Sequence, residues 1–294
     1  MISIAMTTYN GDKYLREQID SILAQTINDF ELIICDDCST DSTWNILSSY
    51  SSIDPRIKIY RNEENLGYLK NFEKAMGLCK GEYIALSDQD DIWMANHLAV
   101  LRDLIGDKVM ACGNSELIDS NGLSLNISLD KIDSFDYVPV DWKQNLMQIV
   151  FFRNPYRGAE MLIRKDFLSH LLPFPNGVWF HDTWIAVLSC LMGGCEYTSQ
   201  ILSKYRIHDN NFTKSRKKKR SKWGELYKNI IHQCTYDRLS IIDGLFERIP
   251  NMNADDKRFL NNLRHHVSLD YSKIGRIKNI PFRIRYFRTI YSCK

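Results

Sequence analysis

Residues 81–93, GEYIALSDQDDIW, place a mostly apolar strand directly before a cluster of carboxylates. Asp88, Asp90 and Asp91 lie within four residues of one another, and such like charges repel unless a cation or solvent separates them. Oxygen ligands suit Mg²⁺ or Mn²⁺, and Mg²⁺ typically combines one or two carboxylates with substrate phosphates. A solvated acidic turn, in which the aspartates cap a helix, is an alternative interpretation of the same residues. The position of the cluster in the fold must therefore decide between the two interpretations.

Outward from this stretch, the first hundred residues alternate between strand and helix patterns. Short apolar runs lie at residues 2–6, 30–35, 57–60 and 82–86, and apolar residues at helical spacing follow the first three of them. This alternation predicts an α/β fold with a parallel, doubly wound sheet. Ligands of such sheets bind beyond the carboxyl ends of the strands. That rule selects three clusters for a binding site: residues 7–10, residues 36–37 and residues 87–91.

The first two clusters offer groups that suit a pyrimidine nucleotide. A carboxylate of the Asp36-Asp37 pair is able to accept a hydrogen bond from the imide N–H of uracil or thymine, and Tyr9 is able to stack on the same base. Turn and cap roles explain each residue taken alone. Because the two clusters follow adjacent strands, we favour the binding interpretation.

The formal net charge of +2 conceals a strong asymmetry along the 294 residues. Residues 1–200 contain 16 Lys and Arg against 28 Asp and Glu, whereas residues 201–294 contain 22 against 8. This distribution predicts an acidic catalytic body and a basic appendage that meets an anionic surface. No apolar run approaches the roughly 20 residues of a membrane span. The N-terminus lacks a basic n-region, so no signal peptide is expected, and the scattered cysteines are expected to be free thiols.

Residues 2–93 resemble the family 2 glycosyltransferases, which are inverting enzymes with the GT-A fold. The matching pieces are ISIAMTTYNG, IDSILAQT, FELIICDDCSTDST, NEENLGY and GEYIALSDQDDIW, in family order and spacing. These pieces lie in residues 2–93, while coverage of the family pattern as a whole is good for about two-thirds of the chain and weak beyond residue 210. The resemblance implies a Rossmann-like, mainly parallel sheet in a catalytic domain over residues 1–210, with a nucleotide-binding half (1–95) and an acceptor half (96–210). A basic, mainly helical region is then expected over residues 211–294.

The resemblance also implies roles for residues that bind the donor. Thr7 and Tyr9 would contact the base and ribose, Asp37 would bind the base imide, and Asp88 would lie near the ribose and phosphates. Asp90 would be the main ligand of an Mn²⁺ or Mg²⁺ ion that bridges both phosphates. Asp91 is more often a local structural carboxylate in this family.

A late segment, YRIHDNN at residues 205–211, resembles the R-x-H segment of the family, in which the histidine often reaches the metal or the diphosphate. We therefore assign His208 to the metal, with a purely structural histidine as the alternative. Arg206 and the basic run at 214–220 suit phosphates of the donor or acceptor, although a charge run is usually a solvated face.

The family's catalytic base is a downstream Asp or Glu that precedes a helix, and Asp182 in WFHDTW (residues 179–184) fits this pattern. A general base must lie within hydrogen-bond reach of the acceptor hydroxyl. Capping of the helix predicted over 183–192 also explains Asp182, and His181 is the alternative base. Glu160 is expected either to orient a sugar hydroxyl or to form a salt bridge at the rim, and we leave it out of the catalytic set.

The C-terminal part offers two further patterns. Apolar residues at helical spacing over 223–248 predict a helix that packs on the catalytic body. Residues 273–294 contain seven basic and no acidic residues with apolar residues between them, which predicts an anchor on an anionic membrane surface. A nucleic-acid arm has a similar composition, but the acidic body and the lack of a recognition motif argue against nucleic acid. We expect a cytoplasmic, peripheral protein at the inner face of the cell membrane.

The function expected from these features is inverting transfer of a single sugar in the synthesis of a bacterial surface polysaccharide such as O-antigen or capsule. UDP-hexose is the first expectation for the nucleotide-sugar donor and dTDP-rhamnose the second, with a lipid-diphosphate-linked glycan as acceptor. A metal-dependent nucleotidyltransferase is an alternative, but residues 7–11 lack the Gly-rich, basic loop that it would normally carry. A non-catalytic nucleotide-sugar-binding protein is disfavoured by Asp90 and Asp182.

Overall fold

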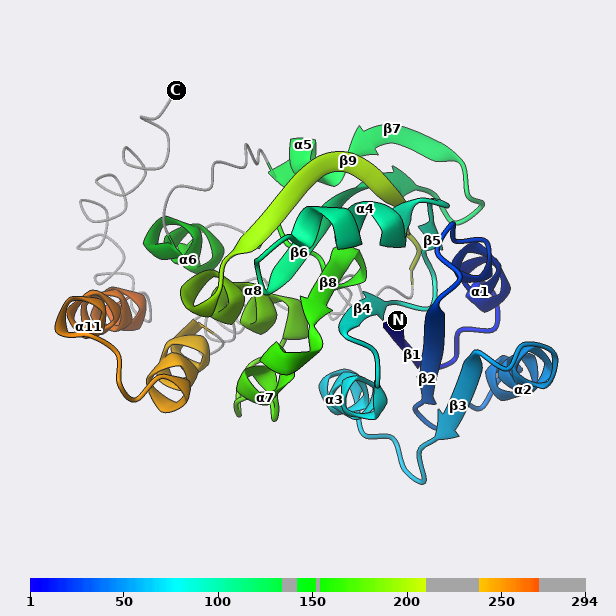
Figure 1. Ribbon diagram of the computed structural model, residues 1–294, viewed down its shortest axis with the longest axis horizontal. Coiled ribbons are helices and arrows are strands. Elements are labelled where there is room, and N and C mark those ends of the chain that lie inside the picture. Colours follow the sequence, from blue (N-terminus) through cyan, green and yellow to red (C-terminus); the bar gives the residue numbers. More distant parts are fainter. Residues whose placement is uncertain (134–141, 152–153, 210–237, 270–294) are drawn as a thin grey trace, which may run out of the picture.

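The computed structural model describes residues 1–133, 142–151, 154–209 and 238–269. All nine of its strands join one sheet in the order β3-β2-β1-β4-β8-β6-β9-β5, with β7 paired to β6 (Figure 1). The strands are β1 (Ile2–Thr8), β2 (Phe30–Asp36), β3 (Ile57–Arg61), β4 (Tyr83–Ser87), β5 (Ile92–Trp93), β6 (Met110–Ile118), β7 (Ser124–Ser128), β8 (Met161–Arg164) and β9 (Cys195–Arg206).

The half of the sheet formed by β1 to β4 is parallel, as the alternating sequence pattern predicted. Strand β1 lies between β2 and β4, with Thr8 opposite Asp36 and Met6 opposite Ser87. This register brings the carboxyl ends of three strands to one edge of the sheet. The polar residues that follow each of them therefore converge there.

The other half of the sheet is mixed. Strand β8 lies antiparallel to both β4 and β6, and β5 lies antiparallel to β9, while β6 and β9 are parallel to each other. The predicted α/β fold with a doubly wound sheet is confirmed, and the antiparallel strands are confined to the part of the chain where the sequence is less regular.

Two layers of helices cover the sheet. One face packs against α1 (Leu15–Leu23), α2 (Thr43–Ile53) and α4 (His97–Ile105). The opposite face packs against α3 (Tyr68–Leu78), α6 (Trp142–Phe151), α7 (Leu168–Leu171) and α8 (His181–Met192). Two 3₁₀ turns, η1 (Gly158–Glu160) and η2 (Lys165–Phe167), flank β8, and α5 (Leu129–Asp133) follows β7. Apolar residues alternate between the two cores along β1, β2, β4, β6 and β8, as expected for strands buried on both sides.

The described C-terminal helices extend the core around α8. Ile241, Ile242 and Leu245 of the helical residues 238–248 are buried there, as are Leu260 and Leu263 of α11 (Ala254–Leu269). For these residues the predicted packing against the catalytic body is confirmed. The division of the chain at residue 210 stays a prediction, and the basic runs 214–220 and 273–294 lie outside the described residues.

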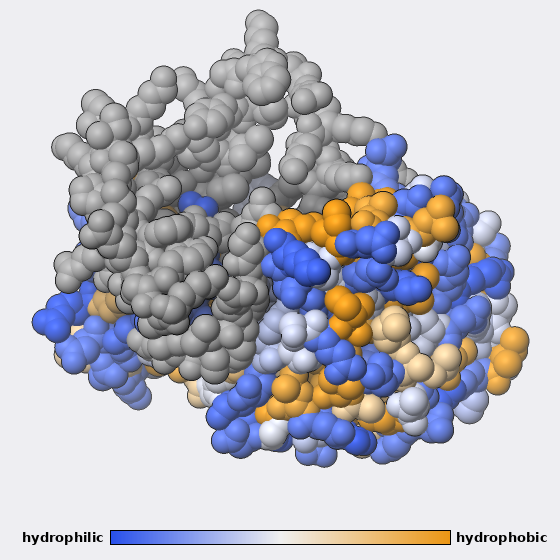
Figure 2. All heavy atoms as spheres, turned by 90° about the horizontal axis from the view of Figure 1, so that it is seen from above, coloured by the Kyte–Doolittle hydropathy of each residue, from blue (hydrophilic) through white to orange (hydrophobic). Residues whose placement is uncertain are grey.

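Three further observations concern the surface, the length of the helices and the cysteines. Figure 2 shows apolar side chains in separate groups among polar ones on the face it displays, not in one continuous field. Within the described residues, no helix is long and apolar enough to cross a membrane. In the described part of the chain no two cysteines form a disulfide bond.

Candidate active site

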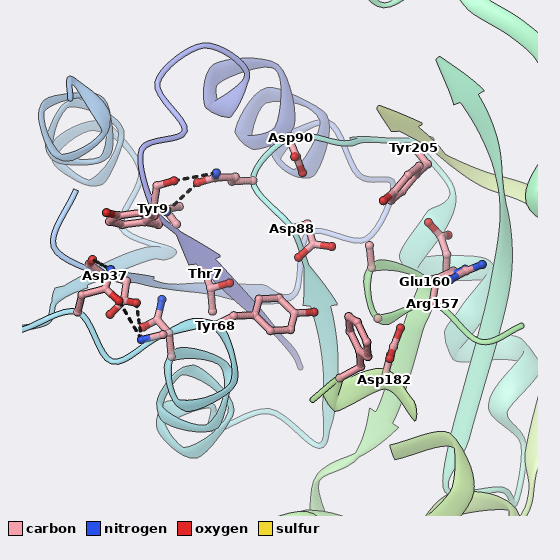
Figure 3. Close-up of a pocket in the computed structure, with 18 residues that line it drawn as sticks. Thr7, Tyr9, Asp37, Tyr68, Asp88, Asp90, Arg157, Glu160, Asp182 and Tyr205 are labelled. Carbon is pink, nitrogen blue, oxygen red and sulfur yellow. Dashed lines mark hydrogen bonds between the residues drawn. The ribbon is translucent and has the colours of Figure 1, made fainter. Parts of the chain in front are cut away.

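A cavity of about 440 Å³ lies at the edge of the sheet where β1, β2 and β4 end. Its volume falls in the range of ordinary small-molecule sites. Six of the residues predicted for the site line it: Thr7, Tyr9, Asp37, Asp88, Asp90 and Asp182. In Figure 3, Tyr9 and Asp37 lie at one end of the cavity, the acidic loop lies in the middle, and Asp182 lies at the other end.

Asp37 is held by the loop that follows β3. Its Oδ1 accepts hydrogen bonds from Asn62 Nδ2 (2.7 Å) and the Leu66 backbone N–H (2.8 Å), and its Oδ2 accepts one from the Gly67 N–H (2.9 Å). Asp37 is 3% exposed but borders the cavity. The three hydrogen bonds compensate for the burial of its charge, and a carboxylate oxygen can still accept a further hydrogen bond from a ligand. This geometry suits an acceptor for one N–H of a ligand.

Asp36 does not share the cavity, which settles the choice left open within the Asp36-Asp37 pair. Its buried carboxylate accepts hydrogen bonds from the hydroxyls of Thr8 and Ser39, and Arg61 Nε lies 3.6 Å away. These contacts tie the loops after β1 and β2 together. Asp36 therefore has a structural role, and the strand register explains it because Thr8 and Asp36 are partners in the sheet.

Tyr9 stands at the mouth of the cavity, where it is 50% exposed. Its backbone N–H donates to Gln89 Oε1 (2.9 Å), and Gln89 Nε2 donates to the Tyr9 carbonyl (3.1 Å). An exposed ring whose backbone is fixed in this way is able to act as a platform for a base. Gln89 was not among the predicted site residues.

In the acidic loop after β4, Asp88 and Asp90 line the cavity, whereas Asp91 lies behind it. Burial, together with the charges of Asp90, Asp182 and Glu160, raises the pKa of Asp88 to about 8. Asp91 does not line the cavity; its Oδ1 accepts a hydrogen bond from the Arg206 backbone N–H (3.0 Å). This placement agrees with the structural role expected of Asp91.

His208 meets Asp90 at the edge of the cavity, with 2.8 Å between His208 Nε2 and Asp90 Oδ2. The Arg206 side chain does not face the cavity, so the expected phosphate contact is wrong. It is buried, donates from Nε to the Asp90 carbonyl (3.0 Å) and pairs with Glu17. Its guanidinium lies 4.6 Å from the centre of the Tyr14 ring, and that ring packs against His208. Arg206 therefore supports the acidic loop from within.

The donor set of this region fits a divalent cation that also binds a diphosphate. Asp88 and Asp90 provide carboxylates in one cavity, and His208 is in contact with Asp90. Within the described residues, no group of three or more His, Cys, Asp or Glu is arranged to hold a metal without help. Mg²⁺ sites commonly use one or two carboxylates and complete the coordination with substrate phosphates and water. The residues present match that kind of site.

Asp182 lies in the first turn of α8, at the opposite end of the cavity from Asp37. Its pKa is raised by burial, against which the charge of Arg157 and a hydrogen bond from Thr183 act. The helix begins at His181 with Phe180 in the N-cap position, so the predicted N-cap role for Asp182 is wrong.

His181 is poorly placed for the alternative role of base. Its ring stacks on Phe72 with 4.2 Å between centroids, and neither ring nitrogen has a hydrogen-bond partner in the described part of the chain. Burial lowers its pKa to about 3, and the residue does not line the cavity. Of the two residues weighed for the base, Asp182 lines the cavity and His181 does not.

Glu160 is buried at the inner end of η1, so the salt bridge expected at the rim is wrong. Its Oε1 accepts hydrogen bonds from the hydroxyls of Ser115 (2.7 Å) and Ser203, while its Oε2 has no hydrogen-bond partner among the described residues. Burial raises its pKa to about 7. The nearby His97 does not neutralise it, because its Nδ1 contacts the Leu202 carbonyl and burial lowers the His97 pKa to about 4.

Several other lining residues were not predicted. The loop after β3 and the start of α3 contribute Asn65, Gly67, Tyr68 and Asn71, and the second half of the chain contributes Arg157, Gly158, Ala159, Phe180 and Tyr205. The strand-end rule offers a signal for the first group, because the loop at residues 62–67 directly follows the strand predicted at 57–60. The second group follows irregular segments and had no comparable signal.

Sequence comparisons identify relatives with named activities. A 29% identical relative over 229 residues is an uncharacterized glycosyltransferase of Haemophilus influenzae, with 71% of this chain and 66% of the relative covered. The putative teichuronic acid biosynthesis glycosyltransferase TuaG of Bacillus subtilis is 27% identical over 235 residues, 78% of this chain and 88% of TuaG. The Escherichia coli UDP-Glc:alpha-D-GlcNAc-diphosphoundecaprenol beta-1,3-glucosyltransferase WfgD is 34% identical over 125 residues, 42% of this chain and 49% of WfgD. The chain thus spans less than two thirds of the length of the first and last of these relatives.

Solved structures share the fold, and the family follows from the sequence. S. aureus TarS 1-349 in complex with UDP-GlcNAc has a TM-score of 0.57 at 17% identity, covering 93% of this chain and 82% of TarS. Mannosyltransferase PcManGT from Pyrobaculum calidifontis, in complex with GDP-Man and Mn2+, has a TM-score of 0.55 at 15% identity, covering 100% of this chain and 88% of PcManGT. The sequence model of glycosyl transferase family 2 matches residues 3–170, which is more than half of the protein. With the cavity at the strand ends and its acidic loop in place, the chain belongs to glycosyl transferase family 2.

Proposed function

We propose that the protein is an inverting glycosyltransferase that moves one sugar from a nucleoside diphosphate onto an acceptor hydroxyl. The observation that carries this proposal is the arrangement of one cavity, in which a base-sized site at Tyr9 and Asp37, the Asp88–Asp90 loop and Asp182 follow one another. A donor laid along this order has its base at one end and its anomeric carbon near Asp182.

Asp182 acts as the general base in this proposal. The acceptor oxygen attacks the anomeric carbon, its proton passes to an Asp182 carboxylate oxygen, and the bond between the anomeric carbon and the diphosphate oxygen breaks. The electron pair leaves with the nucleoside diphosphate, and one displacement inverts the anomeric centre. Burial raises the pKa of Asp182, which makes its carboxylate a stronger base than an exposed aspartate.

Asp90 and His208 would hold Mn²⁺ or Mg²⁺, with Asp88 beside them. A cation bound there supplies positive charge for the leaving diphosphate. Such a cation would also stabilise the ionised carboxylate of Asp88, because burial beside other carboxylates disfavours its charged form. That PcManGT was solved with Mn2+ supports the choice of metal.

A uracil donor is the first choice for the base, and UDP-hexose for the whole donor, with dTDP-rhamnose next. Asp37 keeps acceptor capacity for an imide N–H, which uracil and thymine both carry. TarS was solved with UDP-GlcNAc, and the name of WfgD specifies UDP-Glc. These neighbours support a pyrimidine donor.

The acceptor in this proposal is a lipid-diphosphate-linked glycan of a bacterial surface polysaccharide. The name of WfgD specifies a diphosphoundecaprenol acceptor, and that of TuaG specifies teichuronic acid biosynthesis. Residues 273–294, outside the described part, would bring the enzyme to the anionic inner face of the membrane, since each basic residue near such a surface contributes about 1 kcal/mol.

A donor screen tests this proposal. The purified protein is mixed with UDP-glucose, UDP-galactose or dTDP-rhamnose and a synthetic lipid-diphosphate sugar, with Mn²⁺ or with EDTA, and products are identified by mass spectrometry. We expect one donor to be consumed, transfer to stop in EDTA, and Asp90→Ala to abolish transfer while keeping the wild-type melting temperature. Full turnover in EDTA, or by Asp90→Ala, would remove the metal from the proposal. Transfer of a nucleotidyl group would favour the nucleotidyltransferase alternative.

A further inference from the structure

Gln89 lies between Asp88 and Asp90 in the acidic loop, but its side chain reaches across to the loop after β1. There it makes both hydrogen bonds to the Tyr9 backbone, one as acceptor at 2.9 Å and one as donor at 3.1 Å. A single amide thus satisfies the N–H and the carbonyl of the residue that carries the exposed ring.

Gly11 gives the Gln89 amide the space it occupies. A Cβ atom added to Gly11 would lie 2.2 Å from Gln89 Oε1 and 2.4 Å from its Cδ. Both distances are shorter than van der Waals contact, so a methyl group there would displace the amide. Gly11 is not in the left-handed region, so displacement of Gln89 is the main consequence expected of an alanine at this position.

The neighbours of Tyr9 are held by other contacts. The Asn10 backbone N–H donates to Ser39 Oγ at 2.9 Å, and Asn10 Oδ1 accepts a hydrogen bond from the Thr40 N–H at 2.8 Å. The Gly11 N–H donates to Thr43 Oγ1 at 2.9 Å. Loss of the Gln89 amide would therefore leave the loop attached on the side of α2 and release the peptide groups of Tyr9.

We propose that Gln89 is a positioning residue for the nucleotide: it fixes the Tyr9 ring as the platform for the base and joins that platform to the loop that faces the diphosphate. This inference rests on the proposed function, because it takes Tyr9 to stack on the base. A base stacks on the face of an aromatic ring, and a ring that is not held in place must be ordered when the base binds, which weakens binding.

Calorimetric titration of the full chain with UDP and with dTDP tests the inference. Among Tyr9→Ala, Gln89→Ala, Gly11→Ala and the Tyr9→Ala/Gln89→Ala double variant, we expect Tyr9→Ala to weaken nucleotide binding about tenfold or more. Gln89→Ala and Gly11→Ala should each weaken it about three- to tenfold, to the same extent as each other. The double variant should match Tyr9→Ala within about twofold, because residues that act through one another are not additive.

Kinetics separate positioning of the base from damage to the acidic loop. In Gln89→Ala the KM for the donor should rise while kcat stays near the wild-type value, as expected for lost uniform binding. Gln200→Ala, an exposed glutamine of β9 that does not line the cavity, is the matched control and should change neither.

Three results would overturn the inference. These are unchanged nucleotide affinity in Gln89→Ala, additive losses in the double variant, or a fall in kcat as large as the rise in KM. Failure of the proposed function looks different, because the wild-type protein would then bind neither nucleotide and transfer no sugar. That result would overturn both proposals together.

Discussion

The carboxylates at the two ends of the cavity differ in their hydrogen bonding and in their pKa values. At the base end, Asp37 is buried but accepts three hydrogen bonds from the loop after β3. At the reaction end, Asp182 is half-buried and Glu160 is buried, and both have raised pKa values. Glu160 Oε2 has no hydrogen-bond partner among the described residues. The carboxylate at the base end is already hydrogen-bonded without a ligand. The carboxylates at the reaction end are stabilised when they bind a proton or contact a ligand.

This difference follows from the fold. The base end lies on consecutive parallel strands, whose loops are short, adjacent and rich in polar backbone groups. The reaction end lies where β8 enters the sheet antiparallel between β4 and β6, so Glu160 is surrounded by side chains of β6 and β9 instead of loop N–H groups. Buried carboxylates with few donors have raised pKa values. Such groups suit proton transfer, whereas those at the base end suit recognition.

Asp182→Asn is expected to have the largest effect. An asparagine keeps the shape of the side chain but is unable to accept the acceptor proton, so turnover should fall by about 100-fold to 10,000-fold while UDP affinity stays within about twofold of wild type. Single-turnover transfer and calorimetric titration measure the two quantities. His181→Phe is the control, because His181 stacks on Phe72 outside the cavity, and it should keep most of the turnover. The opposite ranking of the two variants would move the base to His181.

The next effect is a pH dependence of stability that arises from Glu160. Its folded pKa of about 7 lies above the reference value of 4.5, so the folded state binds the extra proton and stability is lost as pH rises through this range. Between pH 4 and pH 8, the free energy of unfolding of wild type should fall relative to that of Glu160→Gln by up to ~3 kcal/mol.

Urea unfolding at several pH values measures this difference. Glu64→Gln, which changes an exposed glutamate, should show the wild-type pH dependence. If the free energy of unfolding of Glu160→Gln depends on pH as steeply as that of wild type, Glu160 does not have a raised pKa in the folded protein. The proposed difference between the two ends of the cavity would then be wrong for this residue.

The same division decides how much of the fold was predictable from sequence. Strands β1 to β4 were predicted to within two residues, because apolar runs and polar turns alternate there. The helix predicted at 183–192 was found as α8, two residues longer. The insertion of β8 between β4 and β6 was not predictable, since it joins segments about 80 residues apart without a local signal.

Site residues were predictable where the strand-end rule or the family motif applied. Thr7, Tyr9, Asp37, Asp88, Asp90 and Asp182 all line the cavity, although their chemical roles stay predictions. Gln89 and Arg206 show the limit of this approach. Each of them acts through contacts to a distant loop, and nothing in the local sequence reveals the direction of a long polar side chain.

Asp37→Asn tests the organised end. The new amide would direct an N–H toward one of the loop N–H groups and leave a buried donor without a partner, at a cost of about 2 kcal/mol. UDP affinity should fall about tenfold, while kcat at saturating donor stays near wild type. Asp54→Asn is the control, because Asp54 also binds backbone and Arg56 but lies outside the cavity. A fall in kcat with unchanged affinity would mean that Asp37 belongs functionally to the reaction end.

Arg206→Lys is expected to have the smallest effect and tests the support beneath the acidic loop. Lysine keeps the charge but loses the planar fork that contacts the Asp90 carbonyl and Glu17, as well as the stacking on Tyr14. We expect a loss of about 1 kcal/mol in unfolding free energy, the size of a net hydrogen bond or of a cation–π contact. The Mn²⁺ concentration for half-maximal transfer should also rise a few-fold.

Arg264→Lys provides the comparison, since Arg264 pairs with Asp243 at an exposed site between the C-terminal helices. It should lose less stability than Arg206→Lys, because exposed ion pairs contribute little, and its Mn²⁺ dependence should stay unchanged. If Arg206→Lys lowers stability but leaves the Mn²⁺ dependence unchanged, Arg206 only supports the fold. If it changes both, the loop between the two ends of the cavity is held by a side chain from β9. In that case the second half of the chain helps to organise Asp90, a residue contributed by the first half.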